Sequence, residues 1–270
     1  MISSNKNATV RFIKSLSKKK SREESGCFFV EGLRGVCDAV SAGAEVRHLV
    51  VSESFLDSAL ADELKNLKDS AETFTAESVL LPVSDSVYEY ITETEAPQGI
   101  GAVIEMKTVT EISGTRLLLL ENMQDPGNMG TVIRTADAAG FDGIICMRGC
   151  VDIYNPKVLR STVGSMFHIP IIRRDSPEDT VSVVVAELKN DGYTLYAAHP
   201  RGGACCFDED FRGKTVIVIG NEANGITEEM LNACDKLLTI PMPGKSESLN
   251  ASVAAAIMMY ETVRKRDKHI

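Results

Sequence analysis

The 270-residue chain has no apolar run that approaches the roughly 20 residues needed to span a bilayer. Its amino terminus also lacks the order of basic, apolar and small residues that marks a secretory signal. We therefore expect a folded protein of the cytoplasm, and its 44% hydrophobic composition suffices for a sizeable core. The length fits one large domain or two modest ones.

Motifs for zinc and for nucleotide phosphates are also missing. The seven cysteines form no CxxC pair, and we expect them to be reduced and mostly buried. Cys146 and Cys150 could suggest a redox pair, but Cys146 lies in an apolar, strand-like run. Neither the dinucleotide pattern GxGxxG nor the phosphate loop GxxxxGK(S/T) occurs. These absences argue against a metal site and against a nucleotide-dependent dehydrogenase.

Basic residues are in the minority, and the net charge of −9 taken alone argues against a nucleic-acid partner. Their distribution reverses that argument. Residues 1–22 contain seven basic side chains and no acidic one, whereas residues 53–95 contain eleven acids and two lysines. The basic end is either a grip for RNA or a solvated tail without a partner, and charge does not separate these interpretations.

A polar, β-branched stretch at residues 107–115 lacks periodic apolar faces and predicts a linker between two domains. The pattern before it predicts a small α/β domain at residues 1–106. Its helices are expected at residues 33–41, 58–68 and 87–92, and its strands at residues 27–30, 46–51 and 100–106.

Short apolar strands alternate with amphipathic helices in the second predicted domain, residues 116–270. This alternation predicts an α/β fold with a mostly parallel sheet covered by helices on both faces. Ligands of such sheets bind beyond the carboxyl ends of the strands. The strands are expected at residues 117–120, 143–147, 169–172, 193–197, 216–219 and 237–241.

The first of three polar loops spans residues 121–136 and follows the strand at 117–120. Asn128 can cap a helix that begins near Gly130, and Arg134 then falls about one turn into that helix. Both side chains would face the ligand edge of the sheet. The alternative is that Asn128 is only a cap and Arg134 only a surface cation.

The second loop, residues 220–225, reads Gly-Asn-Glu-Ala-Asn-Gly and follows the strand at 216–219. Small residues let a ligand approach the backbone closely, and Glu222 offers a hydrogen-bond acceptor. The alternative is that Glu222 only fixes the loop by accepting backbone donors.

The third loop, residues 242–252, leads into an apolar helix at residues 253–263. Ser248, Asn250 and Ser252 crowd polar groups where the donors of a helix start are unpaired. The alternative is an ordinary serine-rich helix start. A single capping residue would suffice for that purpose, so the loop has more polar groups than a helix cap requires.

In this order, the three loops resemble the motifs of the SpoU (TrmH) branch of the SPOUT methyltransferase superfamily. The resemblance covers about residues 115–265, and residues 155–170 look like the second helix of the family. Less specifically, residues 29–32 and 94–99 resemble a small ribosomal-protein-like substrate-binding domain. Ala223 and Ala251 replace a frequent glycine and a frequent valine beside the key positions. The motif matches are Asn-x-Gly-x-x-x-Arg at 128–134, Gly-x-Glu-x-x-Gly at 220–225 and Ser-Leu-Asn-x-Ser-Val-Ala at 248–254.

The resemblance implies an enzyme that transfers a methyl group from S-adenosylmethionine to a ribose 2′-hydroxyl of RNA. Family members with such an amino-terminal domain most often act on large-subunit ribosomal RNA. The alternatives are a tRNA 2′-O-methyltransferase and a non-catalytic RNA-binding module of the same fold. The resemblance also implies a trefoil knot at the carboxyl end, formed around the second and third motifs, and a homodimer packed near it.

The resemblance also implies roles for individual residues. An arginine stays protonated at physiological pH, so Arg134 is either the family's activating group or an electrostatic stabiliser of the reacting oxygen. The expected catalytic residues are Asn128, Arg134, Ser248 and Asn250. The expected cofactor-binding residues are Ile219, Gly220, Glu222, Gly225, Ile240, Met242 and Leu249. The expected RNA-binding residues are Lys18, Lys19, Lys20, Arg22 and Arg160.

Overall fold

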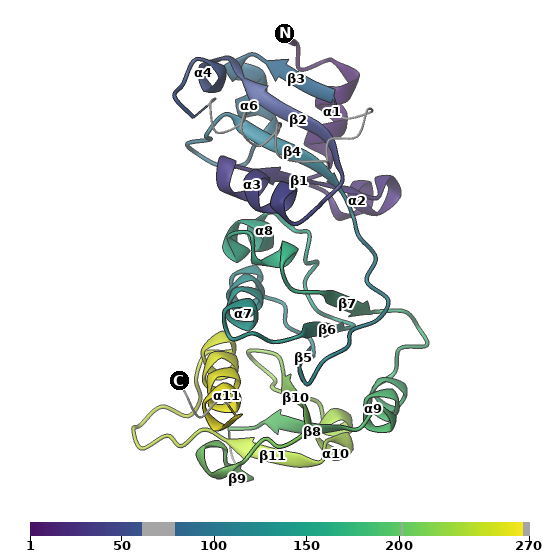
Figure 1. Ribbon diagram of the computed structural model, residues 1–270, viewed down its shortest axis with the longest axis vertical. Coiled ribbons are helices and arrows are strands. Elements are labelled where there is room, and N and C mark those ends of the chain that lie inside the picture. Colours follow the sequence, from purple (N-terminus) through teal and green to yellow (C-terminus); the bar gives the residue numbers. More distant parts are fainter. Residues whose placement is uncertain (61–78, 201, 267–270) are drawn as a thin grey trace. The chain divides into compact units, whose positions relative to one another are not determined.

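The computed structural model describes residues 1–60, 79–200 and 202–266. Two compact units make up the chain, Met1–Lys107 with Tyr154–His168 and Thr108–Ile153 with Ile169–Ile270 (Figure 1). Residues 61–68 of the helix expected at 58–68 lie outside the described residues. Within the described ranges, no helix is both long and apolar enough to cross a membrane.

A four-stranded sheet forms the centre of the first unit, in the order β1-β4-β2-β3. The central strand β4 runs antiparallel to β1 and β2, and β2 runs parallel to β3. Alternate residues of β1 belong to two apolar clusters, one packed against α3 and the other against α1 and α6. The elements are β1 (Cys27–Glu31), α3 (Leu33–Ser41), β2 (Val46–Ser52), α4 (Glu53–Leu56), β3 (Val79–Val83), α6 (Asp85–Ile91) and β4 (Ile100–Glu105).

The basic amino-terminal segment is helical and packed. It forms α1 (Ala8–Ser15) and α2 (Lys19–Ser25), and the Asn7 side chain caps α1 by accepting from two backbone N–H groups. Val10, Ile13 and Leu16 are buried in the cluster that also holds residues of α6. Burial of these three side chains excludes the solvated-tail interpretation of this segment.

The segment that follows β6 in the chain belongs to the first unit. It contains α8 (Pro156–Thr162) and the 3-10 turn η1 (Ser165–Phe167), which contact β1 and α3. Phe28 of β1 anchors it, with ring centroids 4.6 Å from Tyr154 and 6.2 Å from Phe167. The first unit is thus assembled from two separate stretches of sequence.

The second unit contains a seven-stranded sheet in the order β7-β6-β5-β10-β8-β11-β9. Every strand pair in it is parallel, which confirms the predicted α/β class and mostly parallel sheet. The strands are β5 (Arg116–Leu120), β6 (Gly143–Met147), β7 (Ile171–Arg174), β8 (Tyr193–Ala198), β9 (Ala204–Cys205), β10 (Lys214–Ile219) and β11 (Lys236–Thr239).

Helices cover both faces of this sheet. On one face, α9 and α10 share an apolar cluster with alternate residues of β5 and β10. On the other face, α7 and α11 pack together, and α11 contacts β10 (Figure 1). The helices are α7 (Pro126–Ala138), α9 (Val181–Asn190), α10 (Glu228–Ala233) and α11 (Ala251–Arg266).

The strand order places three loops at one edge of the sheet. β10 lies between β5 and β8, so the loop after β10 begins beside the loop after β5, where Glu121 N donates to Ile219 O at 2.9 Å. The loop after β11 starts at Ile240, two residues earlier than expected. In a parallel sheet all these carboxyl ends share one edge, which is where ligands bind.

All seven cysteines are free thiols, but only Cys27, Cys146 and Cys206 are buried and the other four are half-buried, so the prediction that most of them are buried is wrong. A hydrogen bond between the Cys146 and Cys150 side chains raises the pKa of Cys146 and lowers the pKa of Cys150. The Cys150 thiol also donates to the Leu120 carbonyl oxygen at 3.3 Å. Within residues 1–60, 79–200 and 202–266, no group of three or more His, Cys, Asp and Glu side chains is placed to hold a metal ion.

Candidate active site

The helix that follows the first loop begins earlier than the sequence predicts. Its cap is Asp125, whose Oδ1 accepts from the backbone N–H of Asn128 at 2.7 Å, and Pro126 stands in the first turn. The expectation that Asn128 caps this helix is therefore wrong. Because Asp125 serves as the cap, the amide side chain of Asn128 can bond to other loops.

Asn128 joins the three loops by hydrogen bonds. Its Nδ2 donates to Glu222 Oε1 at 3.0 Å, and its Oδ1 accepts from Asn250 Nδ2 at 3.0 Å. Asn250 Oδ1 in turn accepts from the Ser252 hydroxyl at 2.6 Å and from its backbone N–H at 2.9 Å. One continuous chain of hydrogen bonds, Glu222–Asn128–Asn250–Ser252, thus connects side chains that lie 94 and 122 residues apart in sequence.

The second loop is held by Asn221 and not by Glu222. Asn221 Oδ1 accepts from Ala223 N at 2.8 Å and Asn224 N at 3.0 Å, while its Nδ2 donates to Asn122 O at 2.8 Å. In the described part of the chain, the Glu222 carboxylate accepts from Asn128 and from no backbone N–H. The alternative role for Glu222, fixing its own loop, therefore does not describe this structure.

Gly220 and Gly225 close the second loop tightly. The backbones of Asn221 and Gly225 exchange two hydrogen bonds of 2.9 Å. A Cβ added at Gly220 would lie 2.3 Å from the Gly225 carbonyl carbon, which is far inside van der Waals contact. Only glycine fits at position 220, because this residue packs directly against the backbone of Gly225 and Ile226.

A cavity of about 370 Å³ lies beyond the carboxyl ends of β8, β10 and β11. Its volume falls within the range of about 300–1,000 Å³ typical of small-molecule sites. All seven residues expected to bind the cofactor line it, together with Ser248 of the expected catalytic group. Those eight residues are Ile219, Gly220, Glu222, Gly225, Ile240, Met242, Ser248 and Leu249.

The motif pattern does not single out three further lining residues, Ala198, His199 and Pro200. Ala198 is the last residue of β8, and His199 and Pro200 follow it; β8 lies between β10 and β11 in the sheet. The available signal is the apolar strand expected at 193–197, because its carboxyl end must share the ligand edge. Using that signal requires the strand order, which the sequence does not show.

Arg134 stands apart from this hydrogen-bonded chain. It is exposed on α7, six residues after Asn128, and a helix turns about 600° over six residues, which leaves the two side chains about 120° apart. Its guanidinium makes no hydrogen bond or ion pair with any residue that the structure describes. The fold of one polypeptide therefore brings Asn128, Asn250 and Glu222 together but does not bring Arg134 into contact with them.

Family models match both parts of the chain. The model of the SpoU rRNA Methylase family matches residues 115–260, more than half of the chain and all three loops. The chain belongs to the SpoU rRNA methylase family. A second model, the MRM3-like substrate binding domain, matches residues 7–102.

Relatives and solved structures of SpoU methylases resemble the chain over nearly its whole length. The 23S rRNA (guanosine(2553)-2′-O)-methyltransferase RlmP of Bacillus subtilis is 36% identical, covering 96% of this chain and 97% of that protein. The 23S rRNA (uridine(2479)-2′-O)-methyltransferase of Streptomyces viridochromogenes is 32% identical, covering 93% and 87%. The crystal structure of the SpoU methyltransferase AviRb from that organism, in complex with AdoMet, has a TM-score of 0.83 at 32% identity, covering 97% and 99%.

The residues expected to bind RNA in this SpoU methylase lie in the first unit and differ in exposure. Lys18, Lys19 and Lys20 are exposed at the start of α2. Lys19 and Lys20 pair with Glu23 and Glu24 on the same helix, at 3.6 and 3.7 Å. Such exposed pairs contribute little free energy and yield readily to a phosphate.

Arg22 is the exception, because it is only 2% exposed. Its Nη1 donates to the carbonyl oxygens of Leu16 at 2.7 Å and Ser17 at 2.9 Å. The expectation that Arg22 contacts RNA is therefore wrong. Its guanidinium holds the turn between α1 and α2, where those carbonyls have left the helix ladder.

Replacing Arg22 with alanine is expected to lower the free energy of unfolding by about 3 kcal/mol, because it leaves buried carbonyl oxygens without donors. Urea denaturation followed by circular dichroism measures this loss. The matched control is Lys20→Ala, which removes an exposed cation of the same helix and should change stability by less than about 0.5 kcal/mol. A stable Arg22→Ala protein with weakened RNA binding would restore the original assignment.

Proposed function

We propose that this SpoU methylase transfers a methyl group from S-adenosylmethionine to a ribose 2′-hydroxyl of ribosomal RNA of the large subunit. The observation that carries the proposal is the Glu222–Asn128–Asn250 chain of hydrogen bonds at the edge of the cavity. The names of the two relatives, both 23S rRNA 2′-O-methyltransferases, support the substrate class. The AdoMet complex of the AviRb structure supports the methyl donor.

The cavity fits S-adenosylmethionine in its chemistry. Ile219, Ile240 and Leu249 supply apolar surface for an adenine ring. The carboxylates of Glu222 and Glu247 on the lining suit the positive charges of the amino group and the sulfonium. The tight Gly220–Gly225 loop exposes backbone groups to polar atoms of the ligand, so no GxGxxG fingerprint is required.

When bound, S-adenosylmethionine supplies a methyl group on a positively charged sulfur that is a good leaving group. The protein must orient the ribose oxygen and help it to lose its proton. We assign orientation to Asn128, Asn250 and Ser248, because the first two are fixed by the hydrogen bonds between loops and Ser248 lines the cavity. We assign to Arg134 the stabilisation of the developing alkoxide or the adjacent phosphate, because a guanidinium offers hydrogen-bond donors and no acceptor.

We also propose that different segments of the chain have different functions. Residues 1–106 bind the RNA substrate together with residues 154–168, which belong to the same unit. Residues 107–115 link the two domains, and the rest of residues 116–270 carries out methyl transfer in the cytoplasm. The substrate-binding model matched at residues 7–102 supports the first assignment.

We further propose a trefoil knot at the carboxyl end of the chain. Its support is the family resemblance together with the insertion of β10 between β5 and β8.

A homodimer through α11 is the expected assembly. Val253 and Tyr260 are 47% and 50% exposed and lie seven residues apart, so they share one face of the helix. An exposed apolar face of this kind marks an interaction surface. α11 packs against α7, the helix that carries Arg134, so a dimer here places a second subunit close to that helix.

The variant Tyr260→Glu is expected to shift the protein from dimer to monomer, because it buries a charge in the proposed interface. Light scattering coupled to gel filtration measures the mass. Val183→Glu is the matched control, since Val183 is 43% exposed on α9 of the same unit. A Tyr260→Glu protein that stays dimeric would place the interface elsewhere.

Titration calorimetry and a transfer assay test the function itself. S-adenosylmethionine should give a saturable heat and NAD none, because the dinucleotide fingerprint is missing. Methyl transfer to large-subunit ribosomal RNA should exceed transfer to tRNA. Preference for tRNA would correct the substrate, and binding of the donor without any transfer would indicate a non-catalytic RNA-binding module.

A further inference from the structure

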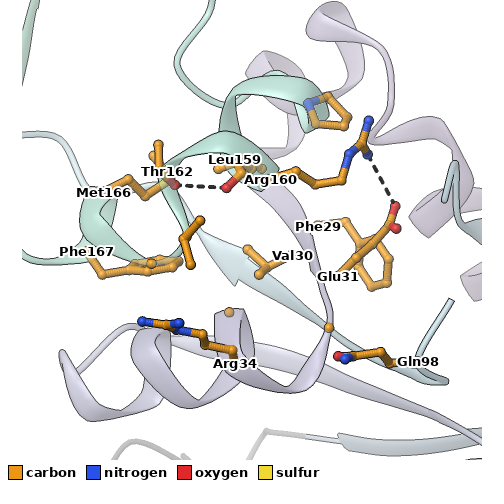
Figure 2. A pocket seen from close by; sticks show the side chains of 15 residues that line it. Phe29, Val30, Glu31, Arg34, Gln98, Leu159, Arg160, Thr162, Met166 and Phe167 are labelled. Carbon is orange, nitrogen blue, oxygen red and sulfur yellow. Dashed lines mark hydrogen bonds and ion pairs between the residues drawn. The ribbon is translucent and has the colours of Figure 1, made fainter. Parts of the chain in front are cut away.

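A second cavity, of about 190 Å³, lies within the first unit, whereas the cavity proposed for the methyl donor lies within the second. It lies between β1, the start of α3 and the α8–η1 segment (Figure 2). Its lining combines two arginines, one carboxylate, two phenylalanines and an amide, namely Arg34, Arg160, Glu31, Phe29, Phe167 and Gln98. A lining that mixes cations, aromatic rings and a hydrogen-bonding group suits a ligand with charged, flat and polar parts.

Both arginines keep most of their donors for a ligand. Arg34 Nε lies 3.8 Å from Asp38, and Arg160 Nη1 lies 3.9 Å from Glu31, so both ion pairs are longer than a hydrogen bond. The Glu31 carboxylate is instead engaged by the hydroxyl of Thr94 at 2.5 Å. Each guanidinium has five N–H donors in a fork that matches the oxygens of a phosphate.

The aromatic and amide groups face the same space. Figure 2 shows Phe167 and Arg34 at one side of the cavity, and Glu31 and Arg160 at the other. Phe167 is only partly buried, so its ring has surface left for stacking. Gln98 Oε1 accepts from the backbone N–H of Leu33 at 2.9 Å, which fixes the amide and leaves its NH₂ group to donate.

An unusual bend builds one wall of the cavity. Val163 and Gly164 have φ angles of +48° and +88°, and the β-branched valine is strained in this left-handed region. The φ of Gly164 favours glycine, and a Cβ there would also lie 1.9 Å from Asp38 Oδ2, so the Asp38 side chain would have to move. The bend turns η1 back so that Phe167 lines the cavity. Backbone strain of this kind is retained where a binding site needs a particular geometry.

We propose that this cavity binds one unpaired nucleotide of the RNA substrate, with Phe167 against its base, Arg34 beside Phe167 on its phosphate, and Arg160 at the opposite side on the next phosphate of the strand. The inference rests on the proposed function for the identity of the ligand as RNA. A cavity of this size excludes a duplex, and only an unpaired base offers a free face for stacking. Arg34 is the new element, because the sequence pattern points to Arg160 alone.

Binding to single-stranded and duplex RNA tests the proposal without relying on catalysis. The probes are oligouridine carrying 5-iodouridine, the same strand paired with oligoadenine, and uridine 5′-monophosphate. Fluorescence anisotropy over a range of salt concentrations measures affinity, and mass spectrometry locates photo-crosslinks. Arg34→Gln is expected to weaken single-strand binding about tenfold and to lower the salt slope by about one. Phe167→Leu should weaken binding at least fivefold with the salt slope unchanged.

Arg47→Gln is the matched control. Arg47 is an exposed arginine of the same unit, paired with Glu105 at 2.9 Å and outside the cavity, and its loss should change affinity less than twofold. Crosslinks should map to peptides that contain Phe29 or Phe167. Thermal melting verifies that each variant is folded. If Phe167→Leu proves unstable, the Arg34→Gln result alone decides the test.

Three results would overturn the proposal: wild-type affinity in Arg34→Gln, crosslinks to other peptides but none to those that line the cavity, or binding of the mononucleotide that RNA does not compete away. The last result would make the cavity a site for free nucleotides. If the proposed function is wrong, the wild-type protein will transfer no methyl group to RNA. The crosslink positions would still show in that case whether RNA binds in the cavity.

Discussion

Replacing Arg134 with alanine is expected to lower kcat about 10²- to 10³-fold while leaving the Kd for S-adenosylmethionine within about twofold. The loss is large because one preorganised cation at the reacting oxygen typically contributes this much. The cofactor affinity is spared because Arg134 does not line the cavity. Stability is spared too, since the side chain is exposed and bonds to no described residue. Single-turnover methyl transfer and calorimetry measure the two quantities.

The lysine variant separates the possible roles of this arginine. Arg134→Lys keeps a point charge but loses the planar fork, so it should remain well below wild-type turnover if Arg134 holds the phosphate or the alkoxide. Near-normal turnover in Arg134→Lys would contradict a bidentate contact. A rate that follows a pKa well below 12, and that loses this dependence without Arg134, would favour the role of base.

Replacing Asn128 with aspartate is expected to reduce kcat at least about 100-fold at pH 8, because a misplaced catalytic group can lose that much. Asn128 Nδ2 donates to Glu222 at 3.0 Å, and an aspartate would set a second carboxylate against the first. Two carboxylates at this distance cannot both stay ionised in contact, so the pKa of one must rise. The ratio of variant to wild-type activity should therefore recover as the pH falls and the pair shares a proton.

The double variant N128D/E222Q is the control for this pair. In this double variant the amide of residue 222 donates a hydrogen bond to the carboxylate of residue 128, which is the reverse of the wild-type direction. It should therefore recover part of the lost rate at pH 8. The acceptor for Asn250 Nδ2 is also retained. A single variant Asn128→Asp with wild-type activity at pH 8 would show that the Glu222–Asn128–Asn250 chain does not position the reacting groups.

The apolar strands and the three loops could be read from the sequence because both are local patterns. The strand expected at 216–219 and the helix expected at 33–41 lie where the structure has β10 and α3. The loops could be placed at one edge because parallel strands share their carboxyl ends. Their contact through Asn128 could not, since it depends on β10 lying between β5 and β8.

Several assignments failed where a side chain competes with a neighbour of similar chemistry. Asp125 and Asn128 both suit a helix cap, and the position of Pro126 in the first turn decides for Asp125. Arg22 continues a run of exposed lysines, yet its burial depends on how α1 and α2 pack, which charge counting does not reveal. Asn221 stands at an unspecified position of the pattern Gly-x-Glu-x-x-Gly, and its bond to Asn122 depends on the three-dimensional arrangement of the two loops.

Mapping 2′-O-methyl groups in total RNA, from cells with and without the gene, tests the central claim most directly. Resistance of the 2′-O-methylated backbone to alkaline cleavage, read by sequencing, locates each site. We predict that one ribose of large-subunit ribosomal RNA loses its methyl group without the gene and regains it with the wild-type gene but not with Arg134→Ala. Unchanged ribose methylation throughout ribosomal RNA, or a change confined to bases, would contradict the account.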